Sequence, residues 1–152
     1  MNPLEYASKP RDSKRESATL TWLRKQPEHD KFEFVWRVLR ENAGLGLVLV
    51  EKSNLKPVYL EAILEFGFVY GDASTVRWWY EATADGLGTK KVINMVSKHL
   101  DDAPLIVDKM IYWLRPEEEK LKEKAAALRS KFHEMYPDFK SGRSTGIHAT
   151  NT

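Results

Sequence analysis

Apolar positions recur with a helical period along most of the chain. In the clearest case, four apolar side chains at spacings i, i+3, i+4 and i+7 share one helix face: Phe32, Val35, Trp36 and Leu39. Asp30 is suited to cap this helix, and Gly44 is suited to end it. Before it, Ser17 is placed to cap a shorter helix that Pro27 closes. The pattern therefore predicts a helical protein.

The later helices are predicted to begin at regular intervals. Proline favours the first turn of a helix, and serine or threonine favours the capping position. These signals predict five helix starts: Pro57, Ser74, Thr89, Pro104 and Pro116. The first four starts are spaced about 15 residues apart, so pairs of helices recur about every 30 residues. Antiparallel helix pairs of this size build α-solenoids.

One stretch resembles a known type of helical repeat. Residues 92–114 carry Leu-Asp-Asp-Ala-Pro, residues 100–104, between two predicted helices. They resemble a HEAT-type repeat, in which an Asp-rich turn followed by proline separates the two helices. The resemblance extends at most over residues 57–114. It implies that these helices stack in successive pairs.

The least regular apolar segment is residues 45–52. Its Gly-Leu-Val-Leu-Val run is β-prone, and residues 66–70 have a similar composition. Residues 45–50 and 66–70 are therefore open to a second interpretation, a small two-stranded ribbon. An isolated ribbon is only marginally stable. We accordingly predict a short buried helix over residues 45–52.

The two ends of the chain lack an apolar period. Residues 1–16 combine two prolines with mixed charges, and residues 137–152 are rich in Gly, Ser, Thr and Asn. Both are predicted to be flexible polar arms, because they offer no apolar face to offset the cost of ordering. Residues 17–136 are then one helical domain. The predicted fold class is all-α, either a short α-solenoid-like stack or an irregular helical bundle, with a long C-terminal helix.

The last predicted helix carries a regular apolar seam. Its members step by four and three residues in alternation: Leu121, Ala125, Leu128, Phe132 and Met135. This is the a/d pattern of two heptads, and it suits packing against one partner helix. That helix belongs either to this domain or to another chain. The second interpretation makes Leu121, Leu128, Phe132 and Met135 candidate interface residues.

Two adjacent tryptophans lie in the helix predicted from Ser74. Neighbouring residues on a helix point about 100° apart, so Trp78 and Trp79 cannot share one face. Trp79 is expected in the core with Tyr80. For Trp78 two interpretations stay open, core or exposed. If exposed, Trp78 and Arg77 form a candidate interface anchor, since tryptophan and arginine are enriched at binding hot spots.

The helix predicted from Thr89 has a polar, basic face. Its members lie away from the apolar stripe of the same helix: Lys90, Lys91, Asn94 and Lys98. Together with the preceding helix and a Gly-containing turn, this arrangement imitates a helix-turn-helix with a polar recognition helix. An ordinary solvated helix face explains the same pattern.

Composition and motifs exclude several classes of function. The chain has no cysteine, which excludes disulfide scaffolds, thiolate nucleophiles and Cys-based metal sites. Its four histidines form no H-x-x-x-H pair, and residues 141–146 lack the P-loop spacing. We therefore expect no catalytic, metal or cofactor site. The longest uncharged apolar run, residues 43–50, is too short to span a bilayer, and residues 1–15 do not resemble a secretory signal.

The sequence thus predicts a non-catalytic helical adaptor or accessory subunit within a larger assembly. Lysine and arginine number 24 against 22 acidic residues, so the net charge of +2 does not favour a strongly electrostatic nucleic-acid binder. The alternative is a helix-turn-helix-like nucleic-acid-binding protein that uses residues 89–100. We expect an intracellular location, in the cytoplasm or an organelle interior, and other protein subunits as partners. Peripheral association with a membrane complex is compatible with this composition.

Overall fold

The protein is all-helical over residues 1–139, the part that the computed structural model describes, and no strand occurs among these residues. The predicted all-α class is confirmed. The elements in order are α1 (Pro3–Ser8), α2 (Ser13–Leu23), α3 (Glu28–Glu41), α4 (Ala43–Lys52), α5 (Pro57–Tyr70), the 3₁₀ turn η1 (Ala73–Thr75), α6 (Val76–Leu87), α7 (Thr89–Lys98), α8 (Pro104–Trp113) and α9 (Glu119–Met135).

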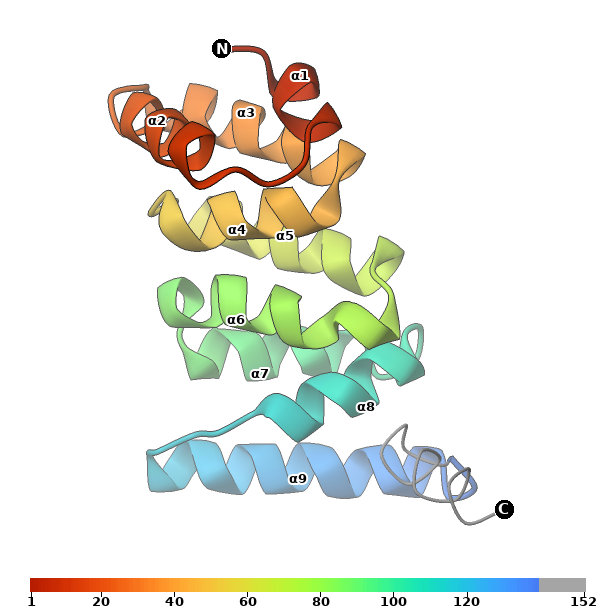
Figure 1. The fold of residues 1–152 in the computed structure, drawn as a ribbon. Helices are drawn as coiled ribbons and strands as arrows, with labels where there is room; N and C mark the ends of the chain where they lie inside the picture. Colours follow the sequence, from red (N-terminus) through yellow and green to blue (C-terminus); the bar gives the residue numbers. More distant parts are fainter. Residues whose placement is uncertain (140–152) are drawn as a thin grey trace.

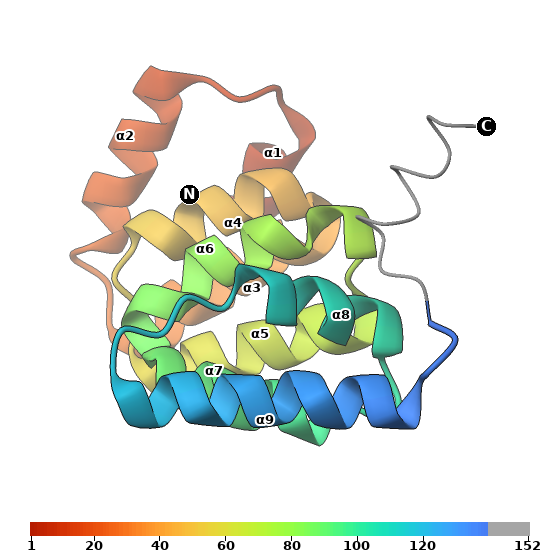
Figure 2. The same cartoon turned by 90° about the horizontal axis from the view of Figure 1, so that it is seen from below.

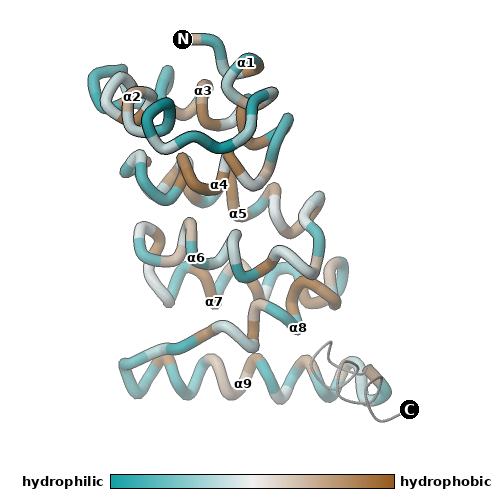
Figure 3. Tube along the Cα trace, in the orientation of Figure 1, coloured by the Kyte–Doolittle hydropathy of each residue, from teal (hydrophilic) through white to brown (hydrophobic). Residues whose placement is uncertain are grey.

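The helices lie across the molecule and follow one another from α1 at one end to α9 at the other (Figure 1). Seen from below, α4, α6 and α8 lie on one side, and α5, α7 and α9 lie on the other (Figure 2). We call α4, α6 and α8 the first layer and α5, α7 and α9 the second layer. Helix α6 packs against α4, α5, α7 and α8, so it is the central element of the first layer. The most apolar segments lie in α4, α5 and α8, whereas α9 and the α1–α2 connection are mostly hydrophilic (Figure 3).

Most of the predicted helix starts are confirmed. Pro57, Thr89 and Pro104 are the first residues of α5, α7 and α8. Helix α6 begins two residues after Ser74, because the turn η1 precedes it. Helix α9 begins three residues after Pro116, so that residue lies in the α8–α9 connection. Local capping and proline signals therefore position the elements to within a single turn.

The β-prone segment forms helix α4, as predicted, and the alternative ribbon is wrong. Residues 66–70 form the last turns of α5. The side chain of Asn42 caps α4, because its Oδ1 accepts a hydrogen bond of 3.1 Å from the backbone N–H of Leu45. Leu45, Leu47, Leu49 and Val50 are all buried. Burial of these side chains outweighs the β preference of the segment.

Helices α3 and α4 touch backbone to backbone at Gly46. A β-carbon built on Gly46 would lie 2.3 Å from the α-carbon of Leu39, which is far inside any real contact. Only glycine allows this approach. Gly44 lies two residues earlier on the same helix, and a side chain would fit there. A β-carbon on Gly44 would meet only the side chain of Asn42, at 3.5 Å.

The structure corrects the prediction of a flexible arm over residues 1–16. Asn2 caps α1 by accepting backbone hydrogen bonds, and Asp12 caps α2 in the same way. Tyr6 and Ala7 are buried, and the ring of Tyr6 meets that of Phe34 on α3 edge to face at 6.3 Å. The arm therefore becomes part of the fold through contacts with α3 that its own sequence pattern does not reveal.

A buried carboxylate fastens this N-terminal segment to α4. Glu16 accepts a hydrogen bond of 2.9 Å from Lys52 on α4 and another of 2.9 Å from Arg11. The bond from Lys52 is the main reason why the pKa of Glu16 lies below its ordinary value, although burial acts in the opposite direction. The ion pairs thus join the α1–α2 connection, α2 and α4 at one point.

Helix α9 ends at Met135, and the residues just after it contact the domain. The hydroxyl of Tyr136 donates a hydrogen bond of 2.7 Å to the carbonyl of Leu100. Phe139 packs edge to face on Phe132, with ring centroids 5.2 Å apart. Residues 137–139 therefore lie against the domain. Residues 140–152, which make up most of the predicted flexible tail, lie outside the described residues.

Replacing Gly46 with alanine is expected to destabilise the protein by about 1–3 kcal/mol, because α3 and α4 must move apart to admit the methyl group. Gly44→Ala is the matched control on the same helix. It should stabilise by up to about 1 kcal/mol, because alanine has the higher helix propensity and meets no clash. Urea unfolding of the two variants tests this. Equal stability of both would contradict the close approach at Gly46.

Candidate protein-interaction groove

The rotation of α6 about its own axis is set by Trp79. This side chain is only 4% exposed and lies against Phe66 on α5, with ring centroids 6.1 Å apart. A β-carbon on Gly67 would lie 2.8 Å from the indole, so α5 and α6 approach closely here. The indole N–H donates a hydrogen bond of 3.3 Å to the hydroxyl of Thr75. The prediction that Trp79 belongs to the core is confirmed.

Trp78, the neighbouring residue, consequently points outward and is 55% exposed. Of the two interpretations of Trp78, the exposed one is correct. The indole lines a groove of about 520 Å³ between the α1–α2 connection, α4 and α6. The other lining residues are Lys9, Pro10, Arg11, Asn42, Gly44, Leu45, Leu47, Val48, Glu51 and Glu81. Apolar side chains of α4 and polar side chains of three segments thus surround one exposed tryptophan.

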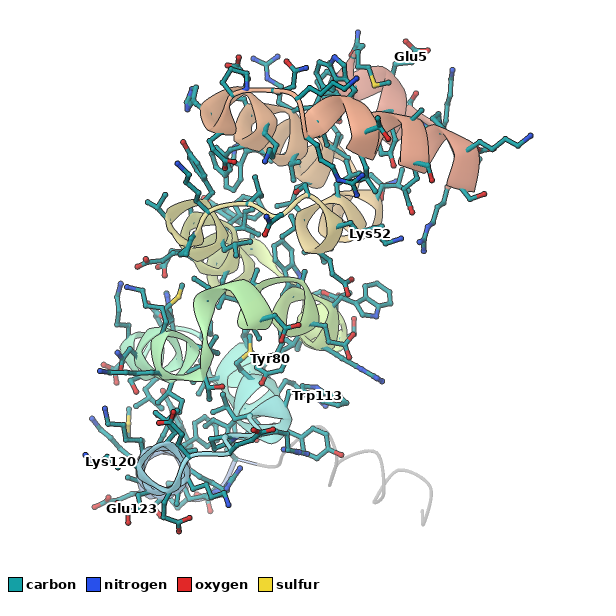
Figure 4. The ribbon with its side chains drawn as sticks, turned by 90° about the vertical axis from the view of Figure 1, so that its left-hand side faces the viewer. Glu5, Lys52, Tyr80, Trp113, Lys120 and Glu123 are labelled. Atoms are coloured by element: carbon teal, nitrogen blue, oxygen red, sulfur yellow. The ribbon has the colours of Figure 1, made fainter. Side chains whose placement is uncertain are left out.

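Arg77, the second predicted interface residue of this helix, has partners within the domain. Its Nε lies 2.7 Å from a carboxylate oxygen of Glu81, one turn further along α6. Its guanidinium lies over the ring of Trp113 on α8, 4.8 Å from the ring centroid. Figure 4 shows Trp113 close to Tyr80 on this side of the molecule. Arg77 therefore helps to hold α8 beside α6 next to the groove.

A second hollow of about 600 Å³ continues from the groove toward α9. It is lined by Glu51, Tyr80, Glu81, Ala84, Asp85, Thr89, Arg115, Glu117, Glu118 and Leu121. Glu51 and Glu81 line both the groove and the hollow, so the two depressions share one boundary. Tyr80 is half-buried there, and burial raises the pKa of its hydroxyl. Five of the ten residues that line the hollow are acidic and one is basic, so the hollow is strongly acidic.

The apolar seam of α9 packs inside the domain. Leu128 and Phe132 are buried, Leu121 is half-buried, and Met135 is the most exposed of the four, at 36%. Helices α7 and α8 both pack against α9. The docking interpretation overlooked α7, which contacts α9 as α8 does, so that two helices of this domain pack against it. Leu128 and Phe132 are thus unavailable to another chain in this structure.

The basic face predicted on α7 is exposed. Lys90, Lys91, Asn94 and Lys98 all reach solvent, and Lys91 lies 3.2 Å from a carboxylate oxygen of Glu61 on α5. This face lies on the second layer of helices, away from the α4 and α6 side chains of the groove. Its use for nucleic-acid binding remains a prediction.

Sequence reasoning missed a buried polar cluster around His99. The ring is 5% exposed and stacks on Phe68 with centroids 4.4 Å apart. Its nitrogens lie 2.9 Å from a carboxylate oxygen of Asp102 and 2.8 Å from one of Glu65. Burial disfavours the charged ring, but the two carboxylates outweigh it, so the pKa of His99 is raised. Glu65 is 34 residues away, and only Asp102 was foreseeable from local sequence.

Alanine at the two tryptophans should have very different effects on stability. Trp79→Ala is expected to cost about 3–5 kcal/mol in the free energy of unfolding, because the transfer and cavity terms add. Trp78→Ala should change stability by no more than about 0.5 kcal/mol, since most of its surface is already in water. Chemical denaturation of both variants measures the difference. Comparable large losses would place both rings in the core.

The His99 cluster should make stability fall as pH rises. The pKa of His99 is higher in the folded than in the unfolded state, so its contribution is complete below the unfolded pKa and disappears as pH passes through the folded pKa. The loss of stability caused by His99→Gln should therefore be largest at acidic pH, below the unfolded pKa, and should shrink as pH rises through the raised folded pKa of His99. His133→Gln, at an exposed position on α9, is the control. A pH-independent loss of stability in His99→Gln would contradict the ion pairs.

Comparison with known proteins identifies no relative. No family model matches the chain, and no curated protein and no solved structure is similar to it. Within residues 1–139, no helix is both long and apolar enough to cross a membrane.

Proposed function

We propose that this protein is a non-catalytic adaptor or accessory subunit that binds a segment of another protein in the groove at Trp78. The observation that carries this proposal is the 55% exposure of Trp78 beside the apolar side chains of α4. Tryptophan is among the residues most enriched at the centres of protein interfaces. A partner residue seated in the groove would cover the indole and displace water from apolar surface.

The contacts that hold the walls of the groove in place support the same function. Burial of Trp79 fixes the direction of Trp78, and the ion pairs of Glu16 hold the α1–α2 connection that forms one wall. A preformed surface loses little conformational freedom when a partner binds, so more of the contact energy becomes affinity. The stacking of helices in two layers supports a scaffold of the helical-repeat kind, as the resemblance of residues 57–114 to HEAT-type repeats implies.

Affinity capture with paired variants tests the proposal. The full chain, Trp78→Ala and Tyr70→Ala are each used to capture proteins from the native source, which mass spectrometry identifies. Tyr70 is the control because it is 73% exposed and does not line the groove. A partner that Trp78→Ala loses and Tyr70→Ala retains is then purified. Its affinity should fall about thirtyfold on loss of the indole, because a hot-spot residue contributes about 2 kcal/mol.

The melting temperatures of the variants separate binding from folding. Trp78→Ala should melt with the unaltered protein, since the indole is mostly exposed. Unchanged partners in all three captures, with unchanged melting, would contradict the groove as the binding surface. A steep salt-dependent affinity for duplex DNA, abolished by neutralising Lys90 and Lys98, would instead favour the nucleic-acid alternative.

A further inference from the structure

We infer that the partner segment is basic and amphipathic, and that it runs from the Trp78 groove into the acidic hollow beside α9. This inference rests on the proposed function, because it extends the same binding surface and names the chemistry of its partner. The apolar residues of the segment lie at Trp78, and its lysine and arginine residues lie toward Glu117 and Glu118. An acidic segment is excluded, because the carboxylates that line the hollow would repel it.

The two depressions form one surface because α4 and α6 contribute to both. Glu51 of α4 and Glu81 of α6 line the groove and the hollow alike. The groove lies toward the α1–α2 connection, and the hollow extends to the α8–α9 connection. A partner segment that follows both would cross α4 and α6 and reach the beginning of α9. The two volumes, about 520 and 600 Å³, allow a single continuous occupant.

The charged side chains that line the hollow end of this path are mainly acidic. Among the residues that line the hollow only Arg115 is basic, and its guanidinium donates to the carbonyls of Tyr112 and Leu114. The carboxylate of Glu81 pairs with Arg77. Four carboxylates of the hollow form no ion pair within the described part of the chain: Glu51, Asp85, Glu117 and Glu118. The lining thus carries five carboxylates against one guanidinium, in a protein whose net charge is +2. The hollow is therefore a local negative field suited to attract cationic side chains.

The opposite end of the path does not offer a matching positive field. Lys9 lies 3.0 Å from Glu5, and Arg11 lies 2.9 Å from Glu16, so acids of the domain already neutralise both bases. Near them the groove is lined by Leu45, Leu47 and Val48 of α4, of which Val48 is the half-buried one. This end accordingly favours apolar side chains over acidic ones. The asymmetry fixes the direction of the segment along the groove.

The floor of the hollow suits the long side chains of lysine and arginine. Tyr80, Ala84 and Leu121 contribute apolar surface between the carboxylates. Lysine and arginine lay their methylene stems on apolar surface while the charged group reaches an acid or water. Nucleic acid does not fit here, because its phosphates would be repelled by the same carboxylates. A basic protein segment satisfies both the apolar floor and the charged rim.

The test uses a fluorescein-labelled synthetic peptide of leucine and lysine with helical periodicity, and a counterpart with glutamate at each lysine position. The full chain is compared with a triple variant of the hollow, Glu51→Gln, Asp85→Asn and Glu118→Gln. The matched control changes three other exposed acids on or next to α9, by Glu123→Gln, Glu134→Gln and Asp138→Asn. Both triple variants raise the net charge equally. Glu123 lies well away from Trp113 and Tyr80 (Figure 4).

Fluorescence anisotropy should show binding of the lysine peptide, weakening with salt, and none of the glutamate peptide. The hollow variant should bind about tenfold more weakly, since each exposed ion pair contributes modestly, whereas the control should stay within about twofold. Equal affinities of the two triple variants, or preference for the glutamate peptide, would overturn the inference. Circular dichroism of both variants verifies that they are folded.

Trp78→Ala distinguishes failure of this inference from failure of the proposed function. Reduced peptide affinity in both Trp78→Ala and the hollow variant supports one continuous site. Loss in the hollow variant alone overturns the continuous path and removes Trp78 from peptide binding. A captured partner that depends on Trp78, together with no binding of the lysine peptide, overturns the basic partner but retains the groove as the binding surface.

Discussion

The packing of Trp79 against the bare backbone of α5 at Gly67 is the contact on which the candidate site depends. It determines how α6 is rotated, because a large indole can enter the core in only one orientation of the helix. Helix α6 in turn packs against four neighbouring helices, so an error in its rotation would spread to both layers. The same rotation directs Trp78, Tyr80 and Glu81 toward the outer surface. The burial of Trp79 thus contributes both to the packing of the helices and to the geometry of the site.

The sequence predicted those elements whose signals are local. Proline, threonine and capping residues located α5, α7 and α8, and apolar periodicity established the all-α class. The first helix was missed because it has six residues and buries only Tyr6 and Ala7. Its stability comes from Phe34 and its other contacts on α3, which no pattern within residues 1–16 can indicate. Short helices that depend on tertiary contacts lie beyond periodicity arguments.

The candidate site was only partly predictable for a similar reason. The 100° step between adjacent helix residues separated Trp78 from Trp79, but the sequence alone left the exposure of Trp78 open. The carboxylates of the hollow come from α4, α6 and the α8–α9 connection, and their proximity arises only when these segments pack. In α9, the heptad pattern correctly indicated a packing seam. It carried no information on which helices cover that seam, and α7 does so together with α8.

The order of the helices also bears on how the chain folds and opens. The principal contacts between helices join neighbours or next neighbours along the chain, such as α3 with α4, α4 with α6 and α7 with α9. Contacts of short sequence separation require little loop closure, which favours rapid folding. They also allow one end of the molecule to open while the other stays intact. Local opening is therefore easiest at α1 and α9, the two ends of the molecule, and hardest at α6, which packs against four helices.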